Sequence, residues 1–123
     1  MPKFNFVLLY VENPIASAAF YEGLLGCNAV DVAATFAMLP LTQGVMLGLW
    51  ARGGVKPIAE GTPGAGEIAL MASDRAEVDA THADWAGRGM TIAQTPAAMD
   101  FGYTFTALDP DGHRVRVMVA EGA

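Results

Sequence analysis

The alternation of apolar and polar residues predicts short strands around two helices. Residues 4–11 (FNFVLLYV) form an aromatic and aliphatic run that is typical of a strand. Apolar residues at helical spacing follow in residues 14–25, where Asn13 is a favourable N-cap and Gly26 a favourable C-terminal stop. Three short strands are expected next, at residues 29–32, 35–39 and 45–50.

The second half of the chain repeats this order of elements. A strand is predicted at residues 67–73 and a helix capped by Asp74 at residues 75–89, followed by strands near residues 91–94, 103–108 and 114–119. Aligning Asn13 with Asp74 gives an offset of 61 residues (74 minus 13), under which Val7 meets Ile68. We interpret the repeat as an internal duplication of a βαβββ module.

This organisation predicts an α+β fold in one domain, residues 1–123. Module one spans residues 1–51 and module two spans residues 67–123. Residues 52–66 (RGGVKPIAEGTPGAG) contain five glycines and two prolines and show no periodicity, so they are predicted to be a linker between the modules.

The first predicted strand is apolar on both faces. Val7 and Leu9 alternate with Phe6, Leu8 and Tyr10. A sheet that is covered by helices on one face only normally has polar residues on the other. The second face is therefore predicted to leave water as well, either against a partner or as the wall of a pocket.

The last predicted hairpin, FTALDPDGHRVRVMV, places two arginines on one face of its second strand. Arg114 and Arg116 alternate there with valines. The DPDG segment predicts a tight turn that is formed by Asp109 and Gly112. We interpret Asp109 as a turn-former and His82 as a surface residue rather than as catalytic groups.

Composition narrows the choice of partners and compartment. The net charge of −6 argues against binding to nucleic acid or to an anionic membrane surface. The single cysteine, Cys27, excludes an internal disulfide and is compatible with a reducing compartment. The first apolar run is too short for a membrane span and does not form a signal peptide. We therefore expect a cytoplasmic protein.

Two segments resemble one known superfamily. VLLYVENPIASAAFYEGLLG and FGYTFTALDPDGHRVRV, set in the repeated βαβββ order, resemble the vicinal oxygen chelate superfamily of glyoxalase I, extradiol dioxygenases and bleomycin resistance proteins. Its enzymes hold a divalent metal through four side chains. The resemblance puts these positions at Phe6, near Trp50 (or Gly48), at Glu67 and at Arg116. Of these residues only Glu67 has a side chain that could bind a metal, whereas a divalent site generally needs three or more protein donors, roughly the number in known sites. The resemblance thus implies a cavity without a metal or other cofactor.

Within the superfamily, GLWARGGVKP, GEIALM and the last hairpin look like the phenazine antibiotic-resistance branch. That branch implies a homodimer that sequesters a planar aromatic small molecule, such as an antibiotic, with Trp50 as the stacking residue. The predicted apolar wall comprises Phe6, Leu8, Tyr10, Met38, Met46, Trp50, Met71, Tyr103 and Met118. The predicted polar groups of the same cavity are Glu67, Arg114 and Arg116.

Three other interpretations stay open at this point. The methionines and aromatic residues also fit an ordinary core. The superfamily includes lyases, isomerases and extradiol dioxygenases, so a glyoxalase-like enzyme is the alternative function. Glu67 is either a base in a metal-free enzyme or, as we favour, an ion-pair partner of Arg116.

Overall fold

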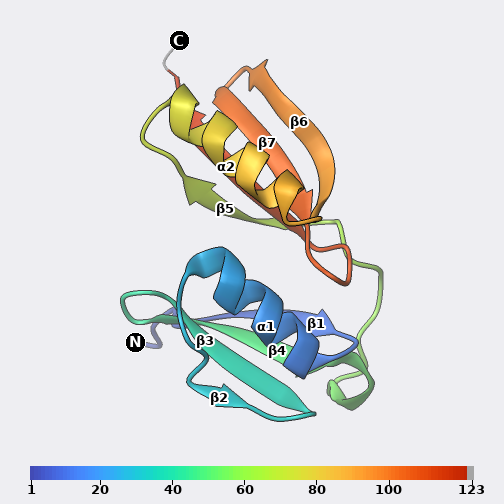
Figure 1. Cartoon of the computed structure of the whole chain (residues 1–123). Helices are drawn as coiled ribbons and strands as arrows, with labels where there is room; N and C mark the ends of the chain where they lie inside the picture. Colours follow the sequence, from blue (N-terminus) through green and yellow to red (C-terminus); the bar gives the residue numbers. More distant parts are fainter. Residues whose placement is uncertain (122–123) are drawn as a thin grey trace. The chain divides into compact units, whose positions relative to one another are not determined.

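The computed structural model describes residues 1–121, and the chain divides into two compact units, residues 1–61 and residues 62 onwards. Each unit is a βαβββ module with a four-stranded mixed sheet, which confirms the predicted α+β fold (Figure 1). The first unit contains β1 (Phe6–Val11), α1 (Pro14–Leu25), β2 (Asp31–Val32), β3 (Phe36–Thr42), β4 (Val45–Ala51) and the short 3₁₀ helix η1 (Arg52–Gly54). The second unit contains β5 (Glu67–Met71), α2 (Arg75–Gly87), β6 (Thr91–Met99), β7 (Gly102–Leu108) and β8 (Arg114–Ala120).

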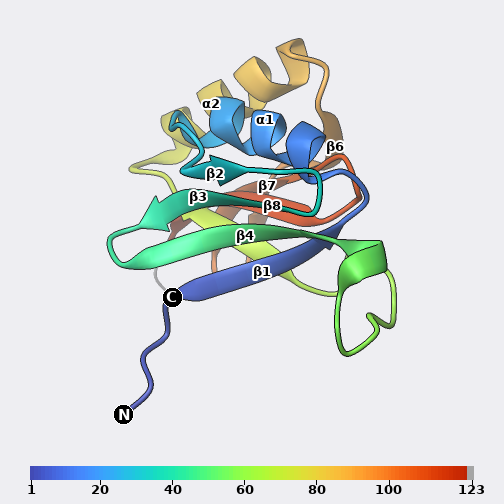
Figure 2. The same ribbon diagram turned by 90° about the horizontal axis from the view of Figure 1, so that it is seen from below.

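The sheet of the first unit has the strand order β1-β4-β3-β2, which can be followed in Figure 2. β1 and β4 are parallel, and the other two pairs are antiparallel. Helix α1 packs on one face of this sheet, mainly against β3 and β4. Four aliphatic side chains on that face are fully buried: Val11, Leu39, Leu47 and Leu49. Burial of this aliphatic layer is the main source of stability of the unit.

The predicted caps of helix α1 are confirmed. The side-chain oxygen of Asn13 accepts a hydrogen bond from the backbone N–H of Ala16 at 3.2 Å, and Pro14 occupies the first helical position. The helix ends at Gly26, whose φ of 68° is a left-handed conformation that glycine adopts without a steric penalty.

The sheet of the second unit has the equivalent order β5-β8-β7-β6, with β5 parallel to β8. Helix α2 covers one face, and its Trp85 contacts Phe105 of β7 edge-to-face at 5.4 Å between ring centroids. Val78, Val115 and Val117 complete the buried layer. The offset of 61 residues joins equivalent positions in the first strand and the helix of the two modules, whereas β7 begins 66 residues after β3 (102 minus 36) and β8 begins 69 residues after β4 (114 minus 45).

The N-terminus of helix α2 is capped as the sequence predicts. The carboxylate of Asp74 accepts from the backbone N–H of Glu77 at 2.8 Å. Glu77 in turn accepts from the backbone N–H of Ser73 at 2.8 Å. These bonds satisfy two donors near the helix start and place negative charge at the positive end of the helix dipole.

The turn between β7 and β8 is held by Asp109. Its carboxylate accepts hydrogen bonds from the backbone N–H groups of Asp111 and His113, each at 2.9 Å. Its backbone oxygen accepts from Gly112 at 3.0 Å, the bond that defines a β-turn. The prediction that Asp109 is a turn-former is confirmed, and this turn sets the register of the two arginines on β8.

The segment predicted as a linker, residues 52–66, is divided between the two units. Residues 52–61 belong to the first unit, where η1 follows β4 and Val55 is buried. Residues 62–66 lead into β5. Within residues 1–121, no helix is long and apolar enough to cross a membrane.

Candidate functional site

The face of the first sheet that α1 leaves open carries a continuous group of apolar side chains. The register of β1 and β4 pairs Leu8 with Gly48 and Tyr10 with Trp50. β3 adds Phe36, which pairs with Trp50. The residues on this face are Phe6, Leu8, Tyr10, Phe36, Met38, Met46, Gly48 and Trp50. Both faces of the first strand were predicted to be removed from water. One face lies beneath α1, and the other is the apolar face that α1 leaves open.

Four of these side chains form a cavity that is open to solvent. Phe6, Leu8, Phe36 and Trp50 line a space of about 320 Å³ that has no polar lining atoms. Gly48 lies between them on β4, and a methyl group there would lie 2.6 Å from Leu8 Cδ2 and 2.9 Å from the Phe36 ring. The absence of a side chain at Gly48 therefore keeps the cavity open.

The indole of Trp50 is held in place by Tyr10. Their ring centroids are 6.2 Å apart and the ring planes are inclined at 84°, an edge-to-face arrangement. Trp50 is only half-buried, so part of its ring remains available to a ligand. Of the other predicted wall residues, Met38 and Met46 lie on the same face of the sheet but do not line the cavity.

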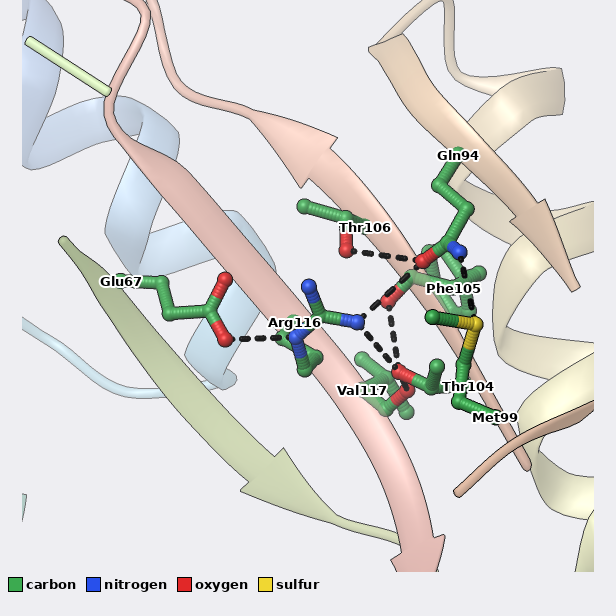
Figure 3. Close-up of polar contacts among 8 residues, drawn as sticks. All are labelled: Glu67, Gln94, Met99, Thr104, Phe105, Thr106, Arg116 and Val117. Carbon is green, nitrogen blue, oxygen red and sulfur yellow. Dashed lines mark hydrogen bonds and ion pairs between the residues drawn. The ribbon is translucent and has the colours of Figure 1, made fainter. Parts of the chain in front are cut away.

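The open face of the second sheet carries a polar cluster that is centred on Arg116 (Figure 3). The Nε of Arg116 donates to Oε1 of Glu67 on β5 at 2.6 Å. The Arg116 side chain is 15% exposed and that of Glu67 33%, so the pair is partly shielded from water. The predicted pairing of Glu67 with Arg116 is confirmed, and it lies within one sheet because β5 and β8 are neighbours.

Two further acceptors fix the guanidinium of Arg116. Its Nη1 donates to Oε1 of Gln94 at 3.2 Å and to Oγ1 of Thr104 at 3.1 Å. The hydroxyl of Thr104 donates its own hydrogen to the carbonyl of Val117 at 2.9 Å, which turns a lone pair toward Arg116 (Figure 3). The guanidinium also lies 5.7 Å from the ring centroid of Phe101. Arg116 is thus a rigid part of the sheet surface.

A second cavity, of about 370 Å³, adjoins this network. Its lining residues are Ala93, Gln94, Met99, Thr106, Arg114 and Arg116. Arg114 also borders a smaller cavity with Glu67 and the preceding glycine-rich segment. Within residues 1–121, the exposed side chain of Arg114 makes no hydrogen bond or ion pair.

Tyr103 does not lie where the sequence analysis placed it. The register of β7 and β8 pairs Tyr103 with Val119, whereas Thr106 pairs with Arg116, so Tyr103 points to the face covered by α2. Its hydroxyl donates to Asp79 of α2 at 2.7 Å, and this bond raises the pKa of Tyr103 above its usual value. The structure therefore removes Tyr103 from the predicted pocket wall.

Met71, Met118 and His82 also differ from their predicted places. Met71 and Met118 pair on the open face of the second sheet, where Met71 is 68% exposed. Neither lines the cavity beside Arg116. The expectation that His82 is a surface residue is wrong, because its ring is half-buried and contacts Phe105 edge-to-face at 5.3 Å.

Comparison with known proteins agrees with this architecture. The model of the glyoxalase/bleomycin resistance protein/dioxygenase superfamily matches residues 3–117, which include both modules. The chain belongs to this superfamily. It is 31% identical over 92% of its length to the phenazine antibiotic resistance protein EhpR of Enterobacter agglomerans, 88% of which is covered.

Solved structures with the same fold include one of considerable sequence similarity. A protein from Agrobacterium tumefaciens with a known solution structure is 48% identical, with a TM-score of 0.89 and coverage of 99% of this chain and 100% of that one. A glyoxalase-related enzyme from Fulvimarina pelagi matches with a TM-score of 0.82 at 20% identity, covering 97% of this chain and 88% of that chain. The second comparison supports the fold alone.

The residues of this chain at the four positions that the resemblance assigns to a metal do not form a set of metal ligands. The corresponding positions hold Phe6, Trp50 or Gly48, Glu67 and Arg116, and the carboxylate of Glu67 is bound to the guanidinium of Arg116. Within the described part of the chain, no group of three or more His, Cys, Asp or Glu residues is placed to hold an ion. A divalent cation would also meet the positive charge of Arg116.

Four residues of these two faces were missed by the sequence analysis. Phe36 lines the apolar cavity, and Gln94, Thr104 and Thr106 surround Arg116. Phe36 has a signal in the sequence, since it alternates with buried residues in the same manner as Met38. The two threonines alternate likewise with Phe105, which is a pattern of one polar and one apolar face.

Proposed function

We propose that this protein is a metal-free binding protein that sequesters a planar aromatic small molecule. The observation that carries the proposal is the cavity of about 320 Å³ lined by Phe6, Leu8, Phe36 and Trp50. Its size falls at the lower end of small-molecule sites, and its lining offers contact surface but no catalytic group. When a flat ring system enters this cavity, its apolar surface is removed from water and it gains contact with aromatic side chains.

Trp50 is proposed as the principal contact of the ligand. Its indole already contacts Tyr10 edge-to-face, which reduces the side-chain entropy that is lost when a ligand stacks on it. Stacked aromatic pairs contribute about 0.5–1.5 kcal/mol beyond the burial of area. The similarity to a phenazine antibiotic resistance protein suggests phenazine, a flat tricyclic heteroaromatic compound, as the first ligand to test.

The alternative, a metal-dependent enzyme of the glyoxalase type, is disfavoured by the donor set. Glu67 has the only side chain of a usual metal ligand among the four expected positions, and it is ion-paired with Arg116. The same ion pair argues against Glu67 as the base of a metal-free enzyme, because Oε1 of its carboxylate already accepts a hydrogen bond from the guanidinium of Arg116 at 2.6 Å. Stoichiometric binding of zinc, nickel, iron or manganese through Glu67 would restore the enzyme hypothesis.

A homodimer is part of the proposal. Each open sheet face leaves large apolar side chains in solvent, with Leu8 on β1 and Met71 on β5 as examples. A two-fold partner buries such patches through a self-complementary contact. Sedimentation equilibrium at micromolar concentration is expected to give about twice the 12.9 kDa chain mass, and a species of one chain mass would refute this part.

The decisive experiment replaces Trp50 with alanine. Phenazine is expected to quench the fluorescence of Trp50 and to leave that of Trp85 unchanged, because Trp85 lies on the buried side of α2 and is only 4% exposed. Trp50→Ala should remain folded and lose about 2 kcal/mol or more of binding free energy, as is typical of a binding hot spot. Equal affinity in the variant, measured by calorimetry, would show that the proposed site is wrong.

A further inference from the structure

The wall of the apolar cavity in the first unit offers a ligand no hydrogen bond. Within residues 1–121, no polar atom is among its lining atoms, which belong to Phe6, Leu8, Phe36 and Trp50. The three strands that carry these side chains, β1, β3 and β4, contain no charged residue. A polar group of a ligand that lies against this wall therefore gives up its water and finds no protein partner in exchange.

The indole nitrogen of Trp50 is the single polar atom of the four lining side chains, and it does not face the cavity. It lies on the side of η1, since a methyl group on Gly54 would be 3.9 Å from it. It is also not among the atoms that line the cavity. Trp50 thus turns carbon atoms toward a ligand and its N–H donor toward the η1 segment.

The backbone of β4 beneath the cavity is directed to its neighbouring strands. β4 lies between β1 and β3, and Gly48 is paired with a residue of each. Backbone hydrogen bonds between strands lie in the plane of the sheet and not along the direction of its open face. The missing side chain at Gly48 lets a ring approach this backbone, which gives the ring contact surface but no donor.

The second module shows that this lack of polar groups does not come from the fold. Its sheet has the equivalent strand order, and β8 occupies the place in that order that β4 has in the first sheet. On β8, Arg116 binds Glu67 and Gln94 on the open face of its own sheet. The architecture therefore admits polar side chains at such positions, and their absence from the first unit is a property of this sequence.

We infer that this wall selects polycyclic aromatic ligands in which one terminal ring carries no polar substituent. That ring enters the cavity, and the polar substituents of the ligand are gathered at its other end. The cavity is open to solvent, so the other end does not have to lie against the four apolar side chains. The inference rests on the proposed function and deepens it, since it names the class of ligand and the end that enters.

The test compares four probes that share one ring system. They are phenazine, a one-ring diol with both hydroxyls on the same terminal ring, its isomer with one hydroxyl on each terminal ring (the two-ring diol), and the dimethyl analogue of the two-ring diol. The diols carry the same polar groups, but only the one-ring diol keeps a bare terminal ring. Calorimetry at about pH 6, below the pKa of a phenolic hydroxyl, measures the affinity for each probe.

The parent protein is expected to bind the one-ring diol with an affinity close to that for phenazine, because the bare ring enters the cavity. It should bind the two-ring diol about tenfold or more weakly, the factor that one unpaired buried hydroxyl gives. The dimethyl analogue should bind at least as tightly as phenazine, because its methyl groups match the hydroxyls in shape and lose no hydrogen bond to water.

Leu8→Asn supplies the partner that the wall lacks. Leu8 is 44% exposed, so an amide of similar size at this position stays hydrated in the free protein and the variant should fold. In this variant the affinities for the two diols should differ by less than about threefold, since the amide both donates and accepts. Ile15→Asn is the matched control, because Ile15 is 52% exposed on α1, which covers the other face of the sheet. It should keep the full difference.

Three results would overturn the inference and leave the proposed function intact. The first is equal affinity of the parent protein for the two diols. The second is a dimethyl analogue that binds as weakly as the two-ring diol, which would make shape and not polarity the cause. The third is a difference between the diols that persists in Leu8→Asn. Failure of the parent protein to bind any of the four probes would instead refute the proposed function, and the inference with it.

Discussion

Gly48 faces Leu8 across the parallel pair of β1 and β4, and a methyl group on Gly48 would lie 2.6 Å from Cδ2 of Leu8. The same methyl group would lie 2.9 Å from the ring of Phe36. Both contacts are closer than van der Waals distance, and both involve the ends of side chains that line the apolar cavity. Gly48 is therefore a determinant of the cavity volume and not only of the strand.

The first prediction follows for Gly48→Ala. The variant should fold, since the clashing atoms belong to side chains beside an open cavity, and it should bind phenazine about tenfold or more weakly, as overpacking costs about 1–3 kcal/mol. Gly23→Ala is the matched control, because nothing lies within 4 Å of a methyl group there. That helix substitution should stabilise the protein by about 0.5–1 kcal/mol and leave affinity unchanged. Unaltered binding by Gly48→Ala would place the ligand elsewhere.

The second prediction concerns the stability supplied by Arg116. Arg116→Met keeps much of the aliphatic stem but removes the donor to Glu67, Gln94 and Thr104. Thr104 is fully buried, so its oxygen cannot regain a partner from bulk water. We expect the free energy of unfolding in urea to fall by about 1.5–3 kcal/mol.

Arg88→Met is the control for Arg116→Met. Arg88 pairs with Asp84 one helical turn away on the solvent side of α2, with both side chains about half exposed. Such a pair contributes about 0.3–0.5 kcal/mol. If the two variants lost the same small amount, the Arg116 network would be no more than a surface ion pair.

The sequence predicted the helices, strands and turns better than it predicted the register between neighbouring strands. Asn13, Asp74 and Asp109 act through bonds to backbone within a few residues, so their roles can be inferred from local sequence alone. The apolar open face of β1 could likewise be predicted, because side chains alternate along one strand with period two. No comparable local signal fixes which residues of two strands lie opposite each other.

Gln94 illustrates this difference. Tyr103 does not, because it lies two residues before the buried Phe105 on β7, so alternation along one strand already places it on the face under α2. Gln94 was predicted at the end of a short strand, whereas β6 continues to Met99 through register shifts on both sides of Gln94. The second shift includes Pro96, which has no backbone N–H for the ladder. These irregularities bring Gln94 to Arg116.

The third prediction tests the placement of Tyr103. Tyr103→Phe removes the hydroxyl that donates to Asp79 and keeps the ring, over which the guanidinium of Arg75 lies at 4.5 Å. We expect a small decrease in melting temperature and no change in affinity for phenazine. A loss of affinity comparable to that of Trp50→Ala would restore Tyr103 to the ligand site.

The last prediction concerns acid pH and the ion pair of Arg75 with Glu121, which follows the end of β8. Nε and Nη2 of Arg75 donate to the two carboxylate oxygens of Glu121, each at 2.6 Å. These bonds lower the pKa of Glu121 below its ordinary value of 4.5. At pH values near 4.5, the unfolded chain therefore binds more protons at Glu121 than the folded chain does.

The sign of the pH effect follows from this difference. The contribution of Glu121 to stability is present above pH 4.5 and is lost as the pH falls through the lower pKa of the folded state. Urea midpoints of the parent protein and of Glu121→Gln should differ slightly at pH 7, because the pair is exposed, and should converge toward pH 3. Glu60→Gln, which changes the same charge on an exposed residue of the first unit, should show no such convergence. A difference for Glu121→Gln that grew on acidification would mean that the pair does not favour the ionised carboxylate in the folded protein.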